Sequence, residues 1–264
     1  MENDNKLMRD VQKEIDSRNV QIDRVGVCGV SYPIIALDHE NKTQNTIANV
    51  SMSVMLPHNF RGTHMSRFIE TLEEFHGRVS PSNLEAMTRR LCEKLNASES
   101  SVIFEFPYYF RKKAPVSGIE SFSRCDINLE AIYESGKFDM ILGVSLNIQT
   151  LCPCSKEISR YGAHNQRALV SLKVRCKGLV WIEELISMIE DSSSAPLHTL
   201  LKREDEKYIT ERAYERPRFV EDVIRELALR LDNENRILWY SARVTSYESI
   251  HNHDAFAEIE RDKR

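Results

Sequence analysis

Hydrophobic positions along this chain recur with the period of a strand in some segments and with the period of a helix in others. Residues 47–56 alternate between apolar and polar side chains, and this period of two predicts a half-buried strand. Residues 68–75 and 81–95 repeat with the helical period instead, and Ser80 before Pro81 supplies an N-cap and a first helical position. Further strand patterns complete the first half, over residues 21–34, 101–106 and 123–134.

The second half repeats this order of elements but not the residues. Strands, then two helices, then two strands are predicted over residues 140–151, 168–176, 181–191, 219–231, 236–247 and 255–262. We therefore predict an α+β fold of two tandem modules, each an antiparallel sheet with paired helices on one face.

The predicted organisation is an N-terminal arm over residues 1–20, a first module over 21–135 and a second over 136–264. The second module is expected to carry most of the active site. Open sheets leave unpaired edges, which oligomerisation commonly hides. Residues 191–217 separate the last two helices, and their length favours a functional excursion, although a solvated charged helix and loop fits the composition equally well.

Composition narrows the class of protein. The 264 residues are 41% hydrophobic and 29% charged, as in an ordinary globular protein, and the net charge of −4 argues against a surface that coats nucleic acid. No apolar run approaches the roughly 18 residues of a membrane helix, and the charged N-terminus is not a secretory signal. We expect a cytoplasmic protein without nucleic-acid or membrane partners.

Cysteine usage points to one candidate site. Six cysteines are scattered along the chain, so a disulfide framework is not expected, and only Cys152 and Cys154 lie close together. They flank Pro153 at a predicted strand end, where a turn is expected, and His164 follows twelve residues after Cys152. Thiolate and imidazole suit zinc, whereas buried apolar cysteines, a solvated histidine or a redox thiol pair remain alternatives.

Other candidate groups lie in loops and at helix starts. Glu248 and His251 fall in the polar segment "YESIHNHDAF", where they could bind metal or move protons, or could simply form a polar hairpin loop. Glu221 lies in the first turn of a helix, where it complements the helix dipole or accepts two N–H groups of a planar ligand. Arg61, His64 and Arg67 precede a helix and could receive phosphate or form a solvated face.

Taken together, the segments "GTHMSRF", "CPCSK", "GAHNQR", "FVEDVIR" and "YESIHNHDA" resemble GTP cyclohydrolase IB, the prokaryotic alternative GTP cyclohydrolase I. These motifs span residues 60 to 256 and occur in the order of that family. The resemblance implies the tunnelling fold, with two modules per subunit and an oligomeric barrel assembly. It also implies a homotetramer with active sites at subunit interfaces.

The resemblance implies a metal-dependent hydrolase that converts GTP and water to 7,8-dihydroneopterin triphosphate and formate, the first step toward tetrahydrofolate. One divalent ion per site is implied, zinc or manganese, with iron as a further option. By likeness, its ligands are Cys152, His164, Glu206 and His251. The register at Glu206 is open, since Glu204 lies two residues away.

The same resemblance assigns the remaining roles. Glu248, Cys154 and His164 would serve acid–base chemistry beside the metal, and Glu221 would anchor the purine. The triphosphate would be bound among the cationic candidates His64, Arg61, Arg67, Lys112, Lys113, Lys156 and Arg167.

Two other functions remain open from the sequence. A related archaeal-type GTP cyclohydrolase would give a dihydroneopterin cyclic phosphate, and a non-catalytic purine-binding or structural module would use the Cys/His site to brace the fold. The sequence leaves the physiological metal open, and also whether the product feeds folate or a modified tRNA base.

Overall fold

The computed structural model describes residue 12 and residues 14–264. Of the predicted arm over residues 1–20, residues 1–11 and 13 therefore lie outside the described part of the chain. The chain divides into two compact units. Unit 1 contains residues 1–36, 47–104 and 130–139, and unit 2 contains residues 37–46, 105–129 and 140–264.

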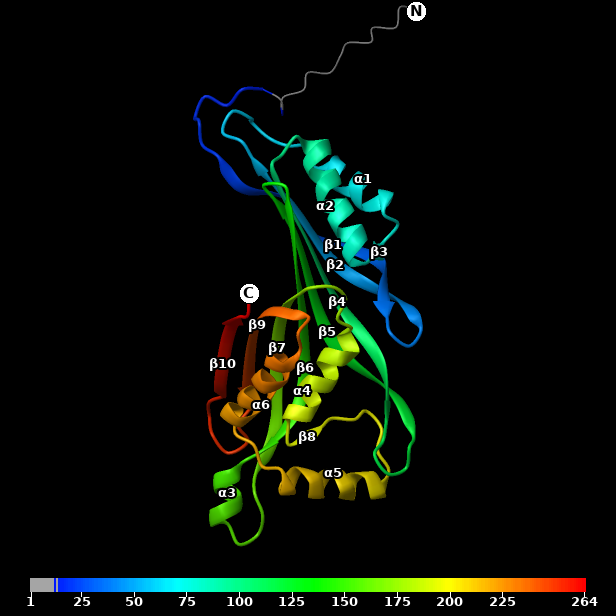
Figure 1. Ribbon diagram of the computed structural model, residues 1–264, viewed down its shortest axis with the longest axis vertical. Coiled ribbons are helices and arrows are strands. Elements are labelled where there is room, and N and C mark those ends of the chain that lie inside the picture. Colours follow the sequence, from blue (N-terminus) through cyan, green and yellow to red (C-terminus); the bar gives the residue numbers. More distant parts are fainter. Residues whose placement is uncertain (1–11, 13) are drawn as a thin grey trace, which may run out of the picture. The chain divides into compact units, whose positions relative to one another are not determined.

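Unit 1 is a sheet with two helices on one face (Figure 1). Its strands lie in the order β5-β4-β2-β1-β3, and β3 is parallel to β1. The two helices pack against each other. The bounds of these elements are β1 (Ile22–Asp38), β2 (Lys42–Leu56), α1 (Ser66–Glu74), β3 (Arg78–Val79), α2 (Pro81–Leu95), β4 (Glu99–Lys113) and β5 (Glu120–Glu134).

The strands of unit 2 lie in the order β10-β9-β7-β6-β5-β4, and β8 pairs with β6. Helices α4 and α6 pack side by side on one face of this sheet (Figure 1). The bounds of its further elements are β6 (Lys137–Leu151), α3 (Pro153–Ile158), β7 (Asn165–Cys176), α4 (Ile182–Ser192), β8 (Ala195–Pro196), α5 (Arg203–Glu215), α6 (Val220–Asn233), β9 (Ile237–Ser246) and β10 (Ala255–Asp262).

The predicted alternation of side chains builds the core of unit 2. Ala168, Val170 and Val174 of β7 are 0% exposed, and so are Val223 and Leu227 of α6. Burying an aliphatic side chain of this size stabilises the fold by about 1.5–3 kcal/mol. The even positions of β7 therefore face the helices, and its odd positions face the opposite side of the sheet.

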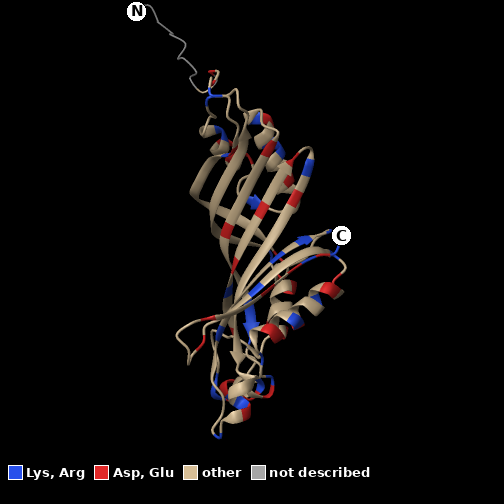
Figure 2. Ribbon diagram, turned by 90° about the vertical axis from the view of Figure 1, so that its left-hand side faces the viewer, with Lys and Arg blue, Asp and Glu red and all other residues tan. Residues whose placement is uncertain are grey.

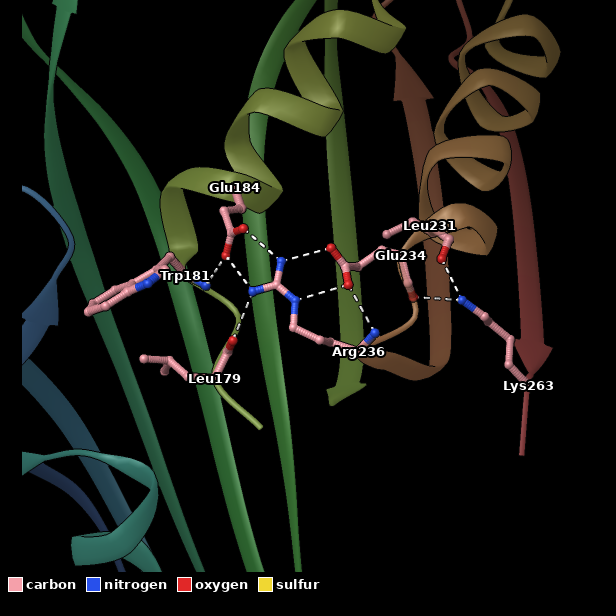
Figure 3. A network of polar contacts seen from close by, with 7 residues as sticks. All are labelled: Leu179, Trp181, Glu184, Leu231, Glu234, Arg236 and Lys263. Atoms are coloured by element: carbon pink, nitrogen blue, oxygen red, sulfur yellow. Dashed lines mark hydrogen bonds and ion pairs between the residues drawn. The ribbon is translucent and has the colours of Figure 1, made fainter. Parts of the chain in front are cut away.

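A polar network joins the ends of four elements in unit 2 (Figure 3). The Arg236 guanidinium donates to Glu184 at the start of α4 and to Glu234 just after α6, with closest distances of 2.7 Å for both. Lys263, after β10, donates to the carbonyl oxygens of Leu231 and Glu234 at 2.7 and 2.9 Å. The hydrogen bonds from Arg236 lower the pKa of Glu184 and bring that of Glu234 to about 2.

A second polar contact anchors α5, which is largely exposed. Asp205 of this helix is 0% exposed and accepts hydrogen bonds from the backbone N–H groups of Val116, Ser117 and Lys202 and from the Ser117 hydroxyl. Burial alone would raise the pKa of Asp205, but these hydrogen bonds hold it below its usual range. The loop between β4 and β5 thus fixes the start of α5.

The structure confirms the predicted α+β class and the order of elements in each half. Elements α3, β8 and β4 differ from prediction. Pro153 begins helix α3 instead of a turn, because proline suits the first helical position. Residues 191–217 contain the unpredicted strand β8 and the charged helix α5, which fits the helix-and-loop alternative, and β4 extends to Lys113. The predicted boundary near residue 135 lies between β5 and β6. The division into a first module over residues 21–135 and a second over residues 136–264 stays a prediction.

Charged residues of both signs are distributed along the strands and helices of each unit (Figure 2). Many form exposed pairs, such as Arg89 with Glu85 on α2 and Arg243 with Glu258 across β9 and β10. Solvent screens pairs of this kind, so each contributes little to stability. No helix in the described part of the chain is long and apolar enough to cross a membrane.

Candidate active site

The β6–β7 connection brings Cys152 and His164 together. Leu151 at the end of β6 pairs with Asn165 at the start of β7, so the intervening residues leave and re-enter the sheet at one point. The Cys152 N–H donates to the His164 carbonyl at 3.1 Å. The His164 N–H donates to the Ser155 hydroxyl at 3.2 Å. Two residues twelve apart in sequence are therefore neighbours in space.

Helix α3 holds the Cys152 side chain at its N-cap position. Pro153 occupies the first helical position, and the Ser155 N–H donates to the Cys152 sulfur at 3.4 Å. Cys152 is half-buried, whereas Cys154 is exposed. Both are free thiols.

The β9–β10 connection supplies the second group of side chains. Ser246, the last residue of β9, pairs with Ala255 of β10 and with Ala168 of β7. The loop between these strands carries Glu248, His251 and His253, and the two imidazole rings are stacked with centroids 5.2 Å apart.

The start of α6 forms the third side of the site. The Arg218 N–H donates to the Leu151 carbonyl at 3.0 Å, which ties the residues before the helix to the end of β6. Phe219 is the N-cap residue, and its N–H donates a hydrogen bond to the Asp222 carboxylate at 3.0 Å. Glu221 then lies exposed in the first turn.

One cavity of unit 2 is lined by all three groups. Its volume is about 390 Å³, which falls within the range of small-molecule sites. The lining includes the predicted site residues Cys152, Cys154, His164, Glu221, Glu248 and His251. Thiol, imidazole and carboxylate groups from distant parts of the sequence therefore face a common space.

A hydrogen-bonded chain connects the two loops beneath this cavity. The Gln166 amide donates to the Ser246 hydroxyl and to Glu248 Oε1, both at 3.2 Å. The Ser246 hydroxyl donates to the same carboxylate oxygen at 2.9 Å. His164 Nδ1 lies 3.0 Å from Gln166 Oε1. Gln166 had no specific role predicted from sequence; it is the second residue of β7, and His164 lies just before that strand.

The donor set in the cavity fits a borderline divalent ion, since it combines a thiol with two imidazoles. However, no three His, Cys, Asp or Glu side chains among residues 12 and 14–264 already converge on a metal-binding geometry. Glu206, the fourth expected ligand, is exposed on α5 and does not line the cavity; Glu204 is exposed on the same helix.

The remaining predicted substrate-binding residues do not line this cavity. Lys156 donates to the Tyr214 carbonyl at 2.6 Å and lies over the Tyr214 ring. Arg167 is exposed on β7 and lines a separate cavity of unit 2. His64 and Arg67 belong to unit 1, where Arg67 donates to the Lys94 carbonyl at 2.6 Å.

Lys112, a cationic candidate, is engaged elsewhere in unit 2. Its ammonium group pairs with Glu190 and donates to the Leu197 carbonyl at 2.7 Å. Burial lowers the pKa of Lys112 and raises that of Glu190, and the charge of each partner opposes these shifts. A buried pair of this kind serves structure rather than phosphate binding.

Comparison with known proteins supports the resemblance carried by the motifs. The family model described as type I GTP cyclohydrolase FolE2 matches residues 8–257. This chain belongs to that family. The GTP cyclohydrolase FolE2 of Kosmotoga olearia is 53% identical over 97% of this chain and 99% of its own length. The FolE2 protein of Geotalea uraniireducens is 50% identical over 97% of this chain and 94% of its own length.

Solved structures support the fold of this FolE2-family chain. Uricase from Arthrobacter globiformis superposes with a TM-score of 0.55, covering 91% of this chain and 93% of its own, at 9% identity. Urate oxidase from Bacillus sp. TB-90 superposes with a TM-score of 0.53, covering 91% of this chain and 100% of its own, at 10% identity. At these identities the likeness concerns the fold alone, and it agrees with the tunnelling fold that the motifs imply.

Proposed function

We propose that the protein is a metal-dependent GTP cyclohydrolase that converts GTP and water to 7,8-dihydroneopterin triphosphate and formate, the first step toward tetrahydrofolate. Family membership supports this proposal over nearly the whole chain. The observation that carries it is one cavity lined by Cys152, His164, His251 and Glu221. Metal ligands and a purine anchor would thereby face the same substrate.

Glu221 would recognise guanine. An ionised carboxylate accepts two hydrogen bonds side by side, which matches the N1–H and exocyclic N–H₂ donors of guanine. Adenine lacks this donor pair, so adenine bound in the same place would cover the Glu221 carboxylate and leave it unpaired, and adenine nucleotides would be rejected. Phe219 also lines the cavity and offers an aromatic surface on which a purine can stack.

Cys152, His164 and His251 would hold the divalent ion, zinc or manganese, because thiolate and imidazole are suitable ligands for such ions. When bound, the ion supplies hydroxide near neutral pH, since it lowers the pKa of coordinated water to about 7. Glu206 would complete the donor set from a second copy of the chain, because it lies on an exposed helix face outside the cavity. A homotetramer with shared sites would provide this contact.

Glu248 and Cys154 would transfer protons during ring opening. Addition of water at C8 of guanine requires a proton at the ring nitrogen, and a second hydrolysis then releases formate. Ribose rearrangement and closure onto the amine return one water, so the net reaction consumes a single water. Ser246 and Gln166 hold Glu248 Oε1, and we assign proton transfer to its other oxygen. Groups in this role typically contribute about 10²–10⁴-fold to the rate.

The triphosphate would be bound by cations that reach the cavity mouth in the assembled enzyme. We retain His64, Arg67, Lys156 and Arg167 as candidates, because phosphate binding requires cations or N–H donors. Arg218 is the one Lys or Arg among the described residues that line the cavity, and it pairs with Glu226. Lys112 is the least suited of the cations, since Glu190 already neutralises it.

Product analysis tests the proposed function. The purified protein, loaded with zinc or manganese, is incubated with GTP, and formate and the pterin are identified by chromatography and mass. We expect formate and 7,8-dihydroneopterin triphosphate in equal amounts. A dihydroneopterin cyclic phosphate would instead assign the archaeal-type reaction. Intact GTP under all metal conditions, with the protein folded, would contradict the enzyme assignment.

A further inference from the structure

We propose that Gln166 is a positioning residue that fixes which ring nitrogen of His164 carries the proton, and so directs Nε2 of that ring to a metal ion. This inference rests on the proposed function, because it concerns a residue expected to bind the metal. Its evidence is the chain of contacts that runs from Glu248 through Gln166 to His164.

The orientation of the Gln166 amide follows from its neighbours. Glu248, when ionised, only accepts hydrogen bonds. The Ser246 hydroxyl gives its single proton to Glu248 at 2.9 Å, so it must accept from Gln166. Both groups therefore require the N–H₂ end of the amide. A flipped amide would place its carbonyl oxygen 3.2 Å from two oxygens that have no proton to donate to it.

This orientation determines the tautomer of His164. The amide leaves only its carbonyl oxygen, Oε1, facing His164 Nδ1 at 3.0 Å, and an oxygen acceptor at that distance requires a proton on Nδ1. Ser249 lies farther away, with its hydroxyl 3.4 Å from Nδ1. If Ser249 donated to a bare Nδ1, the lone pairs of Nδ1 and Gln166 Oε1 would face each other. Nε2 of the neutral ring thus keeps its lone pair.

The geometry of the sheet keeps this chain of contacts in place. Gln166 faces the same side of β7 as the buried residue Ala168, and it pairs across the sheet with Thr150 of β6. Thr150 and Ser246, which flank it, are each 1% exposed. Partners of this kind orient ligating histidines, and their loss typically costs about 10–100-fold in metal affinity.

The first test reads the tautomer directly in the metal-free protein. Nitrogen-15 NMR of the histidine rings distinguishes a proton on Nδ1 from one on Nε2, and the His164 signals are assigned as those absent from His164→Gln. We expect the Nδ1–H tautomer in the native protein. Gln166→Met removes the amide at similar volume, and we expect a mixture of tautomers in it. A native ring protonated on Nε2, or an unchanged tautomer in Gln166→Met, would overturn the inference.

The second test measures zinc affinity by competition with a chelator. We expect Gln166→Met to bind zinc about 10–100-fold more weakly than the native protein. Gln149→Met is the matched control, because Gln149 is a sheet glutamine on neighbouring β6 that bonds Asn165 and does not line the cavity. Equal affinity in Gln166→Met and the native protein would count against the inference.

Failure of this inference is distinguishable from failure of the proposed function. A native enzyme that makes the pterin while His164 carries its proton on Nε2 would refute only the role of Gln166. A protein with the expected tautomer and zinc affinity that leaves GTP intact would refute only the activity. The native spectrum requires no variant, so a misfolded Gln166→Met would not remove the test.

Discussion

At the residue scale, the role of Glu221 is the most open to a kinetic test. We expect Glu221→Ala to lower kcat/KM for GTP by roughly 10- to 100-fold, mainly through KM, because the variant loses hydrogen bonds to a charged acceptor. Zinc content should stay unchanged. Steady-state kinetics and metal analysis on the same preparation measure both quantities.

Glu85→Ala provides the control for this prediction. Glu85 is a helix carboxylate of unit 1 that pairs with Arg89 on α2, and it does not line the cavity. Its removal should leave KM nearly unchanged. Native kinetics in Glu221→Ala would remove the purine-anchor assignment and leave the metal site unaffected.

Several site residues could be predicted from residue types alone, but their assembly could not. A thiol beside a proline and a histidine twelve residues later indicate metal chemistry, and the register of β6 with β7 places both at one cavity. Glu206 gave no such signal, because it lies among other charges in residues 202–207. Gln166 went unassigned because an amide between Asn165 and Arg167 carries no chemistry of its own.

At the element scale, hydrophobic period predicted the long strands and the amphipathic helices. It did not predict α3 or β8, which contain six and two residues and are too short to show a period. Helix α5 is fixed mainly by Asp205 and the distant β4–β5 loop, and local sequence does not reveal a contact that spans 88 residues.

The network around Arg236 should stabilise unit 2 in a pH-dependent manner (Figure 3). Glu184 and Glu234 have pKa values below their ordinary ones in the folded protein. Their contribution is therefore present above an ordinary carboxyl pKa and is lost as the pH falls toward the folded-state values. We expect Arg236→Met to lower Tm by a few degrees near pH 7.

The difference in Tm between Arg236→Met and the native protein should shrink as the pH is lowered from about 7 to about 3. Arg243→Met, which loses only an exposed pair with Glu258, should change Tm much less. Thermal unfolding followed by circular dichroism measures all three proteins. A difference that grows on acidification would contradict the assigned direction of the carboxylate pKa shifts.

At the scale of the whole molecule, the sequence motifs predicted the family, and the family match confirms it. Oligomeric state and metal identity depend on contacts outside a single chain, so neither follows from periodicity. Glu206 is exposed and lies outside the cavity that holds the other expected ligands, so the proposed role of Glu206 at the metal depends on a second copy of the chain.

Complementation tests the shared site. Cys152→Ala and Glu206→Gln should each be inactive alone. If Glu206 acts on the site of a neighbouring subunit, each working site needs Cys152 from one subunit and Glu206 from the other. In an equal mixture of the two variants, each of these residues is intact in half of the subunits. Subunit exchange should therefore restore about a quarter of the sites. Activity measured before and after exchange gives the result. Inactive mixed oligomers would place all ligands in one chain or remove Glu206 from the site.

X-ray absorption spectroscopy of the zinc-loaded protein tests the metal site most directly. We expect one sulfur ligand at about 2.3 Å and nitrogen or oxygen ligands at about 2.0–2.1 Å. The sulfur contribution should disappear in Cys152→Ala, together with most of the bound zinc, and should persist in Cys154→Ala. A native spectrum without sulfur, or full zinc retention with an unchanged spectrum in Cys152→Ala, would contradict the proposal that this cavity binds the catalytic ion.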